Sequence, residues 1–138
     1  MKKLFLFFVF LIPFTLNSDE NILNFLQKHK WEPTIKVSIK SYYTYEFHKD
    51  KIIEIFNDDA YDIRNIDTLH ILKHLIKNDI IVFSVIEKHI VFDENNNQYL
   101  QLANILLSIR KLSDKTILLH KQYYPDGEET TGIYKIYE

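Results

Sequence analysis

The chain contains 138 residues, of which 17 are Lys or Arg and 19 are Asp or Glu, so its formal net charge at pH 7 is −2. Charges of both signs are mixed along the chain, and no cluster of basic residues is present to replace the counterions of a nucleic acid. Nucleic acid is therefore excluded as a partner. Cysteine is absent, so the fold lacks the disulfides that support many small exported domains and depends on its apolar core.

Residues 1–18 have the pattern of a secretory signal peptide. Lys2 and Lys3 supply a positive start, a run of Leu, Phe, Val and Ile follows, and Ser18 is a small residue at its end. A membrane-spanning helix needs about 20 apolar residues, and this run is shorter, so a permanent anchor is the weaker alternative. We expect cleavage near Ser18, export to the periplasm or the medium of a bacterium, and one mature domain over residues 19–138 without a stable membrane span.

The pattern that follows predicts a short helix over residues 18–30. Acidic side chains stand in the first turn, where the helix dipole favours them, and Pro33 acts as a stop signal. Four residues share one face at helical spacing: Ile22, Phe25, Leu26 and His29. We expect this face to pack on a sheet, or alternatively to cover the end of a barrel.

From Ile35 to His48 the apolar period changes to two, which predicts a long half-buried strand. A polar break at Lys49 and Asp50 separates this strand from a second one over residues 51–56, so the two are expected to form a hairpin. Unbroken alternation over this length favours a curved barrel or a strongly twisted sheet.

The rest of the chain predicts further strands, and its last third predicts an antiparallel meander with turns at residues 113–115 and 125–127. Residues 67–77 also fit a helical face, but we favour a strand because the segment after them is rich in Ile, Val and Phe. The expected strands are residues 61–63, 67–77, 80–86, 89–92, 99–100, 105–112, 116–124 and 130–137.

The last third, SIRKLSDKTILLHKQYYPDGEETTGIYKIY, resembles the final strands of small bacterial lipocalin-like domains, with the terminal strand around Tyr134 and Lys135. Trp31, between the short helix and the long strand, is similar to the tryptophan that opens the first strand of lipocalin-type barrels. The resemblance implies a mainly β fold, either an antiparallel up-and-down barrel or a cupped sheet with a short N-terminal helix. It also implies a pocket for a small apolar ligand.

Five aromatic residues are the candidates for lining such a pocket: Tyr43, Tyr45, Phe47, Phe83 and Phe92. Aromatic side chains at period two are also common as plain core residues. The nine tyrosines could alternatively form the girdles of an outer-membrane barrel, but several strands are apolar on both faces, as buried strands are, so this is the weaker interpretation.

No pattern for catalysis, for a cofactor or for a metal site is evident. His70 and His74 would meet at one metal ion only on a helix, since on a strand they lie on one face about 13 Å apart. The chain has no Gly-x-Ser-x-Gly elbow, no phosphate-binding glycine loop and no calcium loop. We therefore expect no catalytic residues, no metal and no cofactor.

The sequence favours an exported, non-catalytic protein that binds a small apolar ligand in a barrel pocket. The alternative is a structural or interaction module whose core is filled and whose edge strand or tyrosine-rich face meets another exported protein. A sizeable apolar cavity would favour the first function.

Overall fold

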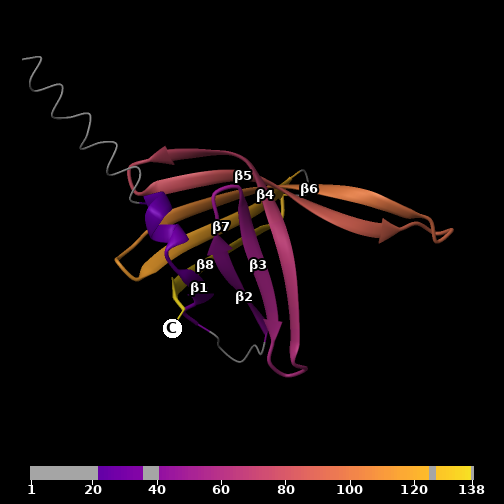
Figure 1. Ribbon diagram of the computed structural model, residues 1–138, viewed down its shortest axis with the longest axis horizontal. Helices are drawn as coiled ribbons and strands as arrows, with labels where there is room; N and C mark the ends of the chain where they lie inside the picture. Colours follow the sequence, from indigo (N-terminus) through magenta and orange to yellow (C-terminus); the bar gives the residue numbers. More distant parts are fainter. Residues whose placement is uncertain (1–21, 36–40, 125–126, 138) are drawn as a thin grey trace, which may run out of the picture.

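The computed structural model describes residues 22–35, 41–124 and 127–137, so the expected signal peptide at residues 1–18 lies outside the described residues. The described chain forms a closed antiparallel barrel in which each strand pairs with the next along the sequence (Figure 1). The strands are β1 (Lys30–Pro33), β2 (Ser41–Phe47), β3 (Lys51–Asp58), β4 (Ile63–Lys77), β5 (Ile80–Phe92), β6 (Gln98–Lys111), β7 (Thr116–Tyr124) and β8 (Glu129–Ile136). The prediction of a mainly β, up-and-down architecture is confirmed.

Pairing between the first and last strands closes the barrel. Trp31 of β1 lies opposite Ile136 of β8, and Pro33 lies opposite Tyr134. Because β1 also pairs with β2, through Lys30 and Trp31, the sheet closes on itself. The structure is thus the barrel and not the open, cupped sheet that the sequence left as the other possibility.

A short helix over residues 22–27 covers one end of the barrel (Figure 1). Its Ile22 and Leu26 are buried with Trp31 in the main core. The Trp31 indole Nε1–H donates a hydrogen bond to the Leu26 carbonyl at 3.1 Å, and the Phe25 ring meets the indole edge at 5.2 Å between centroids. The apolar face predicted for the helix therefore closes this end, which we call the helix end.

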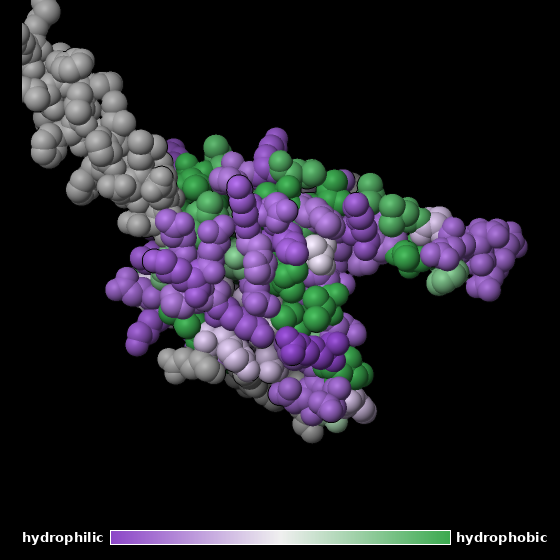
Figure 2. Space-filling model, viewed as in Figure 1, coloured by the Kyte–Doolittle hydropathy of each residue, from purple (hydrophilic) through white to green (hydrophobic). Residues whose placement is uncertain are grey.

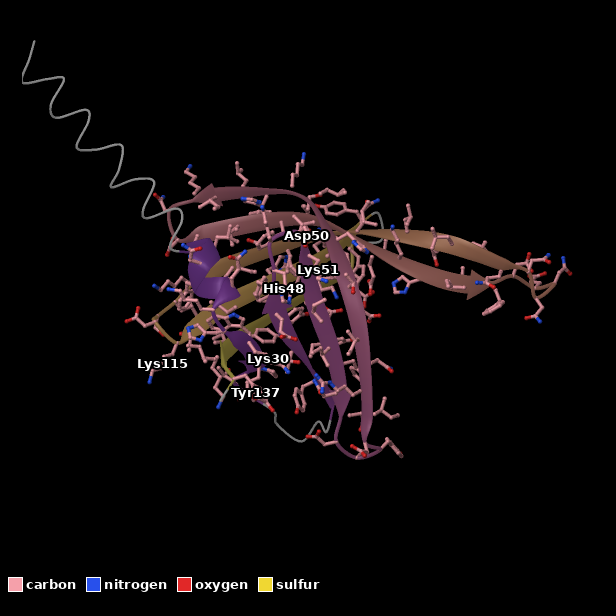
Figure 3. The ribbon with its side chains drawn as sticks, in the orientation of Figure 1. Lys30, His48, Asp50, Lys51, Lys115 and Tyr137 are labelled. Atoms are coloured by element: carbon pink, nitrogen blue, oxygen red, sulfur yellow. The ribbon has the colours of Figure 1, made fainter. Side chains whose placement is uncertain are left out.

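The connections β2–β3, β4–β5 and β6–β7 lie at the helix end, because the strands alternate in direction. Figure 3 labels residues of two of these connections, His48 and Asp50 in one and Lys115 in another. The Ile136 amide donates to the Lys115 carbonyl at 3.1 Å, and the Ile71 amide donates to the Asp50 carbonyl at 3.0 Å. The helix end is consequently the well-packed base of the barrel.

Several strand bounds differ from those expected. Of the strand expected at residues 61–63, Tyr61 and Asp62 lie in a turn, where Asp62 adopts a left-handed φ of 54°, and Ile63 is the first residue of β4. Residues 67–77 belong to strand β4, as we favoured. Segments 80–86 and 89–92 are one strand, β5, because Glu87 keeps the inward parity and is buried instead of ending the strand. Residues 36–40 of the long strand expected from Ile35, and 125–126 of the last expected turn, lie outside the described residues.

Strands β5 and β6 extend together beyond the ends of their other pairing partners. The partners of β5 on β4 end at Glu87, and the partners of β6 on β7 begin at Asn104. Residues 88–103 therefore form a two-stranded antiparallel ribbon that projects from the barrel, and we call it the β5–β6 arm (Figure 1). The segments expected at 99–100 and 105–112 belong to one continuous strand, β6, which ends at Lys111.

Apolar side chains fill the half of the barrel nearest the helix. Those that are almost completely buried are Trp31, Phe83, Leu26, Ile52, Ile55, Leu69, Ile81, Ile105, Leu107, Ile109, Ile117 and Leu119. All of them except Ile55 belong to one continuous cluster. Within the described part of the chain, no helix has the length and apolar character needed to span a membrane.

Candidate functional site

Charged side chains occupy inward positions in the half of the barrel away from the helix. On β3, Glu54 follows the buried Ile52 by two residues, and on β7, Lys121 follows the buried Leu119 by two residues. Because strand side chains alternate between faces, both charged groups point into the barrel with the apolar core. Their side chains are only 3% and 6% exposed.

Glu54 and Lys121 form a buried ion pair. The Lys121 ammonium donates to both carboxylate oxygens, with Nζ 2.7 Å from Oε2 and 3.0 Å from Oε1. The Tyr45 hydroxyl donates a third hydrogen bond to Oε2 at 2.6 Å. The full set of partners is what allows these charges to remain inside a core, where an unpaired charge would be very costly.

The electrostatic surroundings shift the ionisation of this group. Burial alone would lower the pKa of Lys121, but attraction and hydrogen bonding to the Glu54 carboxylate outweigh burial and raise it above its ordinary value. Burial, and then repulsion from Glu54, raise the pKa of the Tyr45 phenol well above its ordinary value. The lysine is therefore a fixed cation and Tyr45 a fixed hydrogen-bond donor near neutral pH.

Two more carboxylates lie beside the pair. Glu54 faces Asp67 across the β3–β4 ladder, and Glu87 reaches the same region from β5. One carboxylate oxygen from each of Glu54, Asp67 and Glu87 lies within 4.8 Å of the others. His89 Nε2 is 3.1 Å from Glu87 Oε2. Both oxygens of Glu54 already bind the ammonium, so the other two carboxylates have no lysine of their own in the described part of this layer. We call Glu54, Asp67, Glu87 and Lys121 the polar layer.

Tyrosine rings surround the ammonium of the polar layer. Lys121 Nζ lies 4.8 Å from the centroid of the Tyr123 ring and 5.7 Å from that of Tyr43, within the range of cation–π attraction. The Tyr134 ring meets the Tyr45 ring edge to face at 5.3 Å. Burial raises the pKa of Tyr43, Tyr123 and Tyr134, so these phenols stay neutral. The barrel thus already holds one cation between carboxylates and aromatic faces.

The structure brings four of the five predicted pocket residues into the barrel. Tyr45, Phe47 and Phe83 belong to the buried core, and the rings of Phe47 and Phe83 are stacked at 6.0 Å. Tyr43 lies farther from the helix and is 41% exposed, close to the polar layer. Phe92 does not join them, because it lies on the β5–β6 arm with most of its side chain exposed.

The sequence predicts that His70 and His74 lie on one face of their strand, and this prediction is wrong. His70 lies opposite Ile86 and His74 lies opposite Phe83, and these two partners point to opposite faces of β5. The cause is a bulge between Ile71 and Lys73, which inserts one residue and reverses the parity of the strand. The pair therefore does not share one face of the sheet.

Sequence reasoning missed the polar layer, although a signal for it was present. In KIIEIF and ILLHKQ, a charged residue stands at the parity of the buried apolar residues of its own strand. Such a position predicts a buried charge, and two of opposite sign predict a pair. The tyrosines around the lysine could not be assigned to it, since they come from strands far apart in the sequence.

Comparison with family models, curated proteins and solved structures finds no match to this chain. The eight-stranded up-and-down barrel is compatible with a lipocalin-like fold. The function must consequently be argued from the polar layer and its surroundings.

Proposed function

We propose that this protein is a non-catalytic, exported binder with a lipocalin-like barrel, and that its ligand is a small molecule with an apolar body and one cationic group, such as an amine. The observation that carries the proposal is the polar layer, in which the Lys121 ammonium already sits between carboxylates and tyrosine rings. A ligand cation would find the same two kinds of group beside it. Export itself rests on the signal-peptide pattern of residues 1–18.

The balance of formal charge supports a cationic group on the ligand. Three carboxylates face one ammonium in the polar layer, and their oxygens lie within 4.8 Å of one another. Like charges at this spacing repel, and the repulsion is stronger where water is partly excluded. Asp67 is the best placed to receive a ligand cation, because it is only half-buried and its carboxylate makes no hydrogen bond or ion pair with the other described residues.

The aromatic surroundings support an apolar body. The Tyr43 and Phe56 rings lie 5.3 Å apart and are only partly buried, in the same half of the barrel as Asp67. Partly buried rings offer apolar area and ring faces at small ordering cost. The half nearest the helix is filled by the core, so a ligand would approach from the opposite end.

Two fluorescent probes of nearly equal size test the proposal. Dansylcadaverine carries an alkylammonium group, and N-butyl dansylamide has the same dansyl ring with a neutral alkyl chain. We expect the cationic probe to bind with enhanced emission and the neutral probe to bind at least tenfold more weakly, about 1.4 kcal/mol. Asp67→Asn should remove most of this preference. Equal binding of the two probes to the unmodified protein would contradict the proposal.

A matched variant separates a local effect from a general change of charge. Asp79→Asn alters a carboxylate by the same one charge in the exposed β4–β5 turn, at the helix end. Binding of dansylcadaverine should be the same in this variant as in the unmodified protein. A loss equal to that of Asp67→Asn would show that the probe responds only to the overall charge.

A further inference from the structure

The β5–β6 arm presents an apolar face to water. Ile90 lies opposite Leu100 in the ladder, and the same face carries Phe92 and Leu102. Each of these four side chains is more than half exposed. In Figure 2 the arm is lined by hydrophobic side chains, while its tip is hydrophilic. An isolated two-stranded ribbon is marginal in water, so an uncovered ribbon of this composition indicates a partner.

The face of the arm that carries Ile90 continues onto the barrel wall, past the exposed Lys88 of the same parity. Val82, Ser84 and Ile86 have the same parity on β5 as Ile90, so they lie on the same face of the strand. There the wall holds a groove of about 340 Å³, which has Leu75, Val82 and Leu106 among its lining residues. The volume of the groove exceeds that of a phenyl ring, and the groove lies along the strand from the arm that carries Phe92.

Charges on the arm and at the groove are complementary. The turn at the tip of the arm carries Asp93 and Glu94, both exposed. Lys73 lines the groove, and Lys77 lies on the same face of β4, two residues beyond Leu75. If the tip of one arm lies over the groove of another molecule, acidic side chains meet lysines at the rim of an apolar contact.

We propose that two copies of this chain form a two-fold dimer in which each β5–β6 arm lies antiparallel along the outer wall of the other barrel and Phe92 enters the other copy's groove. A two-fold interface needs a surface that complements itself, with residue i of one copy on residue j of the other and the reverse. Each copy carries both the arm and the groove, so the same arm-in-groove contact occurs twice about the two-fold axis, which satisfies this condition. The inference does not depend on the proposed ligand.

The area available is sufficient for such a dimer. Ile90, Phe92, Leu100, Leu102 and Leu75 are between 52% and 72% exposed. At about 200 Å² for a large apolar side chain, they expose about 600 Å² on each copy. Covering this area on both copies buries about 1,200 Å², the lower end of specific protein interfaces. A membrane surface fits less well, because the acidic tip would meet the headgroups of anionic lipids first.

Engineered disulfides test the contact directly, because the chain contains no cysteine. The variant that carries both Phe92→Cys and Leu75→Cys should form a covalent dimer on mild oxidation, seen as a band of twice the mass without reductant. A matched variant with Phe92→Cys and Ile66→Cys places the second thiol on a similarly exposed position outside the groove. It should give at least tenfold less dimer. Equal yields would overturn the proposed geometry.

Sedimentation equilibrium tests the dimer without cross-linking. Ile90→Asp should raise the dimer dissociation constant at least tenfold, since it buries a charge in the apolar contact. Ile66→Asp is the matched control, because the two isoleucines are 61% and 62% exposed and only Ile90 lies on the arm. The control should dimerise like the unmodified protein. A loss of dimer in both variants would show that the loss is not specific to the arm, against the proposed contact.

Three further results would overturn the proposal. The first is an unmodified protein that stays monomeric at about 100 μM, a concentration at which a dimer of about 1 μM dissociation constant is mostly assembled. The second is a dimer that persists unchanged in Ile90→Asp. The third is a monomer that sediments with phosphatidylcholine vesicles and loses this property in Ile90→Asp, which would assign the arm to a lipid surface.

Discussion

Replacing Lys121 by methionine tests whether the buried ion pair is required for the barrel. The substitution keeps most of the side-chain volume but removes the ammonium that lies 2.7 Å and 3.0 Å from the two oxygens of Glu54. The carboxylate would keep only the hydrogen bond from Tyr45. Removing one partner of a buried pair typically costs about 3–5 kcal/mol, because the remaining charge stays in the core unpaired.

A second variant separates the cost of the unpaired charge from the value of the pair. Lys121→Met together with Glu54→Gln removes both charges, while the side-chain carbonyl of the introduced glutamine can still accept from the Tyr45 hydroxyl. Replacement of a whole buried pair is often close to neutral. We therefore expect the double variant to recover at least about 2 kcal/mol of the loss, a coupling that only groups in contact show.

Urea unfolding followed by tryptophan fluorescence measures these differences. Trp31 is the only tryptophan and is fully buried at the helix end, so its emission reports on the loss of the core. Lys115→Met, in the exposed β6–β7 turn, is the control and should change stability by less than about 0.5 kcal/mol. The reasoning fails if Lys121→Met costs no more than this control, or if the double variant is as unstable as the two single changes combined.

Three further predictions concern other parts of the barrel. Because burial raises the pKa of Tyr45, the contribution of its phenol to stability is complete below about pH 10 and is lost as the pH rises above that value. Tyr45→Phe should therefore cost about 1.5–3 kcal/mol at pH 7, yet its urea midpoint should fall less steeply between about pH 9 and pH 11 than that of the unmodified protein. An equally steep fall would contradict this assignment. Gly132→Ala places a Cβ 3.2 Å from the Tyr134 ring, so we expect a destabilisation of about 1 kcal/mol in thermal unfolding. An unchanged thermal midpoint would show that the ring moves away without cost. Zinc should leave the melting temperature unchanged, since His70 and His74 lie on opposite faces of the sheet. A saturable rise of the melting temperature at micromolar zinc, abolished in both His70→Ala and His74→Ala, would contradict the register of β4.

The strands of the barrel could be predicted where the period of two is regular, as it is in β2, β3 and β7. Closure could not be predicted, because it depends on the pairing of β1, only four residues long, with β8 at the other end of the chain. The bulge before Lys73 has no local signal either, and it reverses the face of everything after it on β4. The sequence predicts two strands in place of β5, because Glu87 resembles a polar break when its inward position is unknown.

The polar layer shows what a single sequence leaves open, namely which buried charges meet across the barrel. The parity of Glu54 and Lys121 places each of them inside the barrel, but neither strand alone explains why a charge is tolerated there. The explanation is that β3 and β7 face each other across the closed barrel, which brings together two residues that are 67 positions apart in the chain. Once the barrel is closed, each charge has its partner, and the excess of carboxylates over ammonium groups follows from Asp67 and Glu87. That excess, next to partly exposed aromatic rings, is what supports our proposal of a cationic ligand over a purely apolar one.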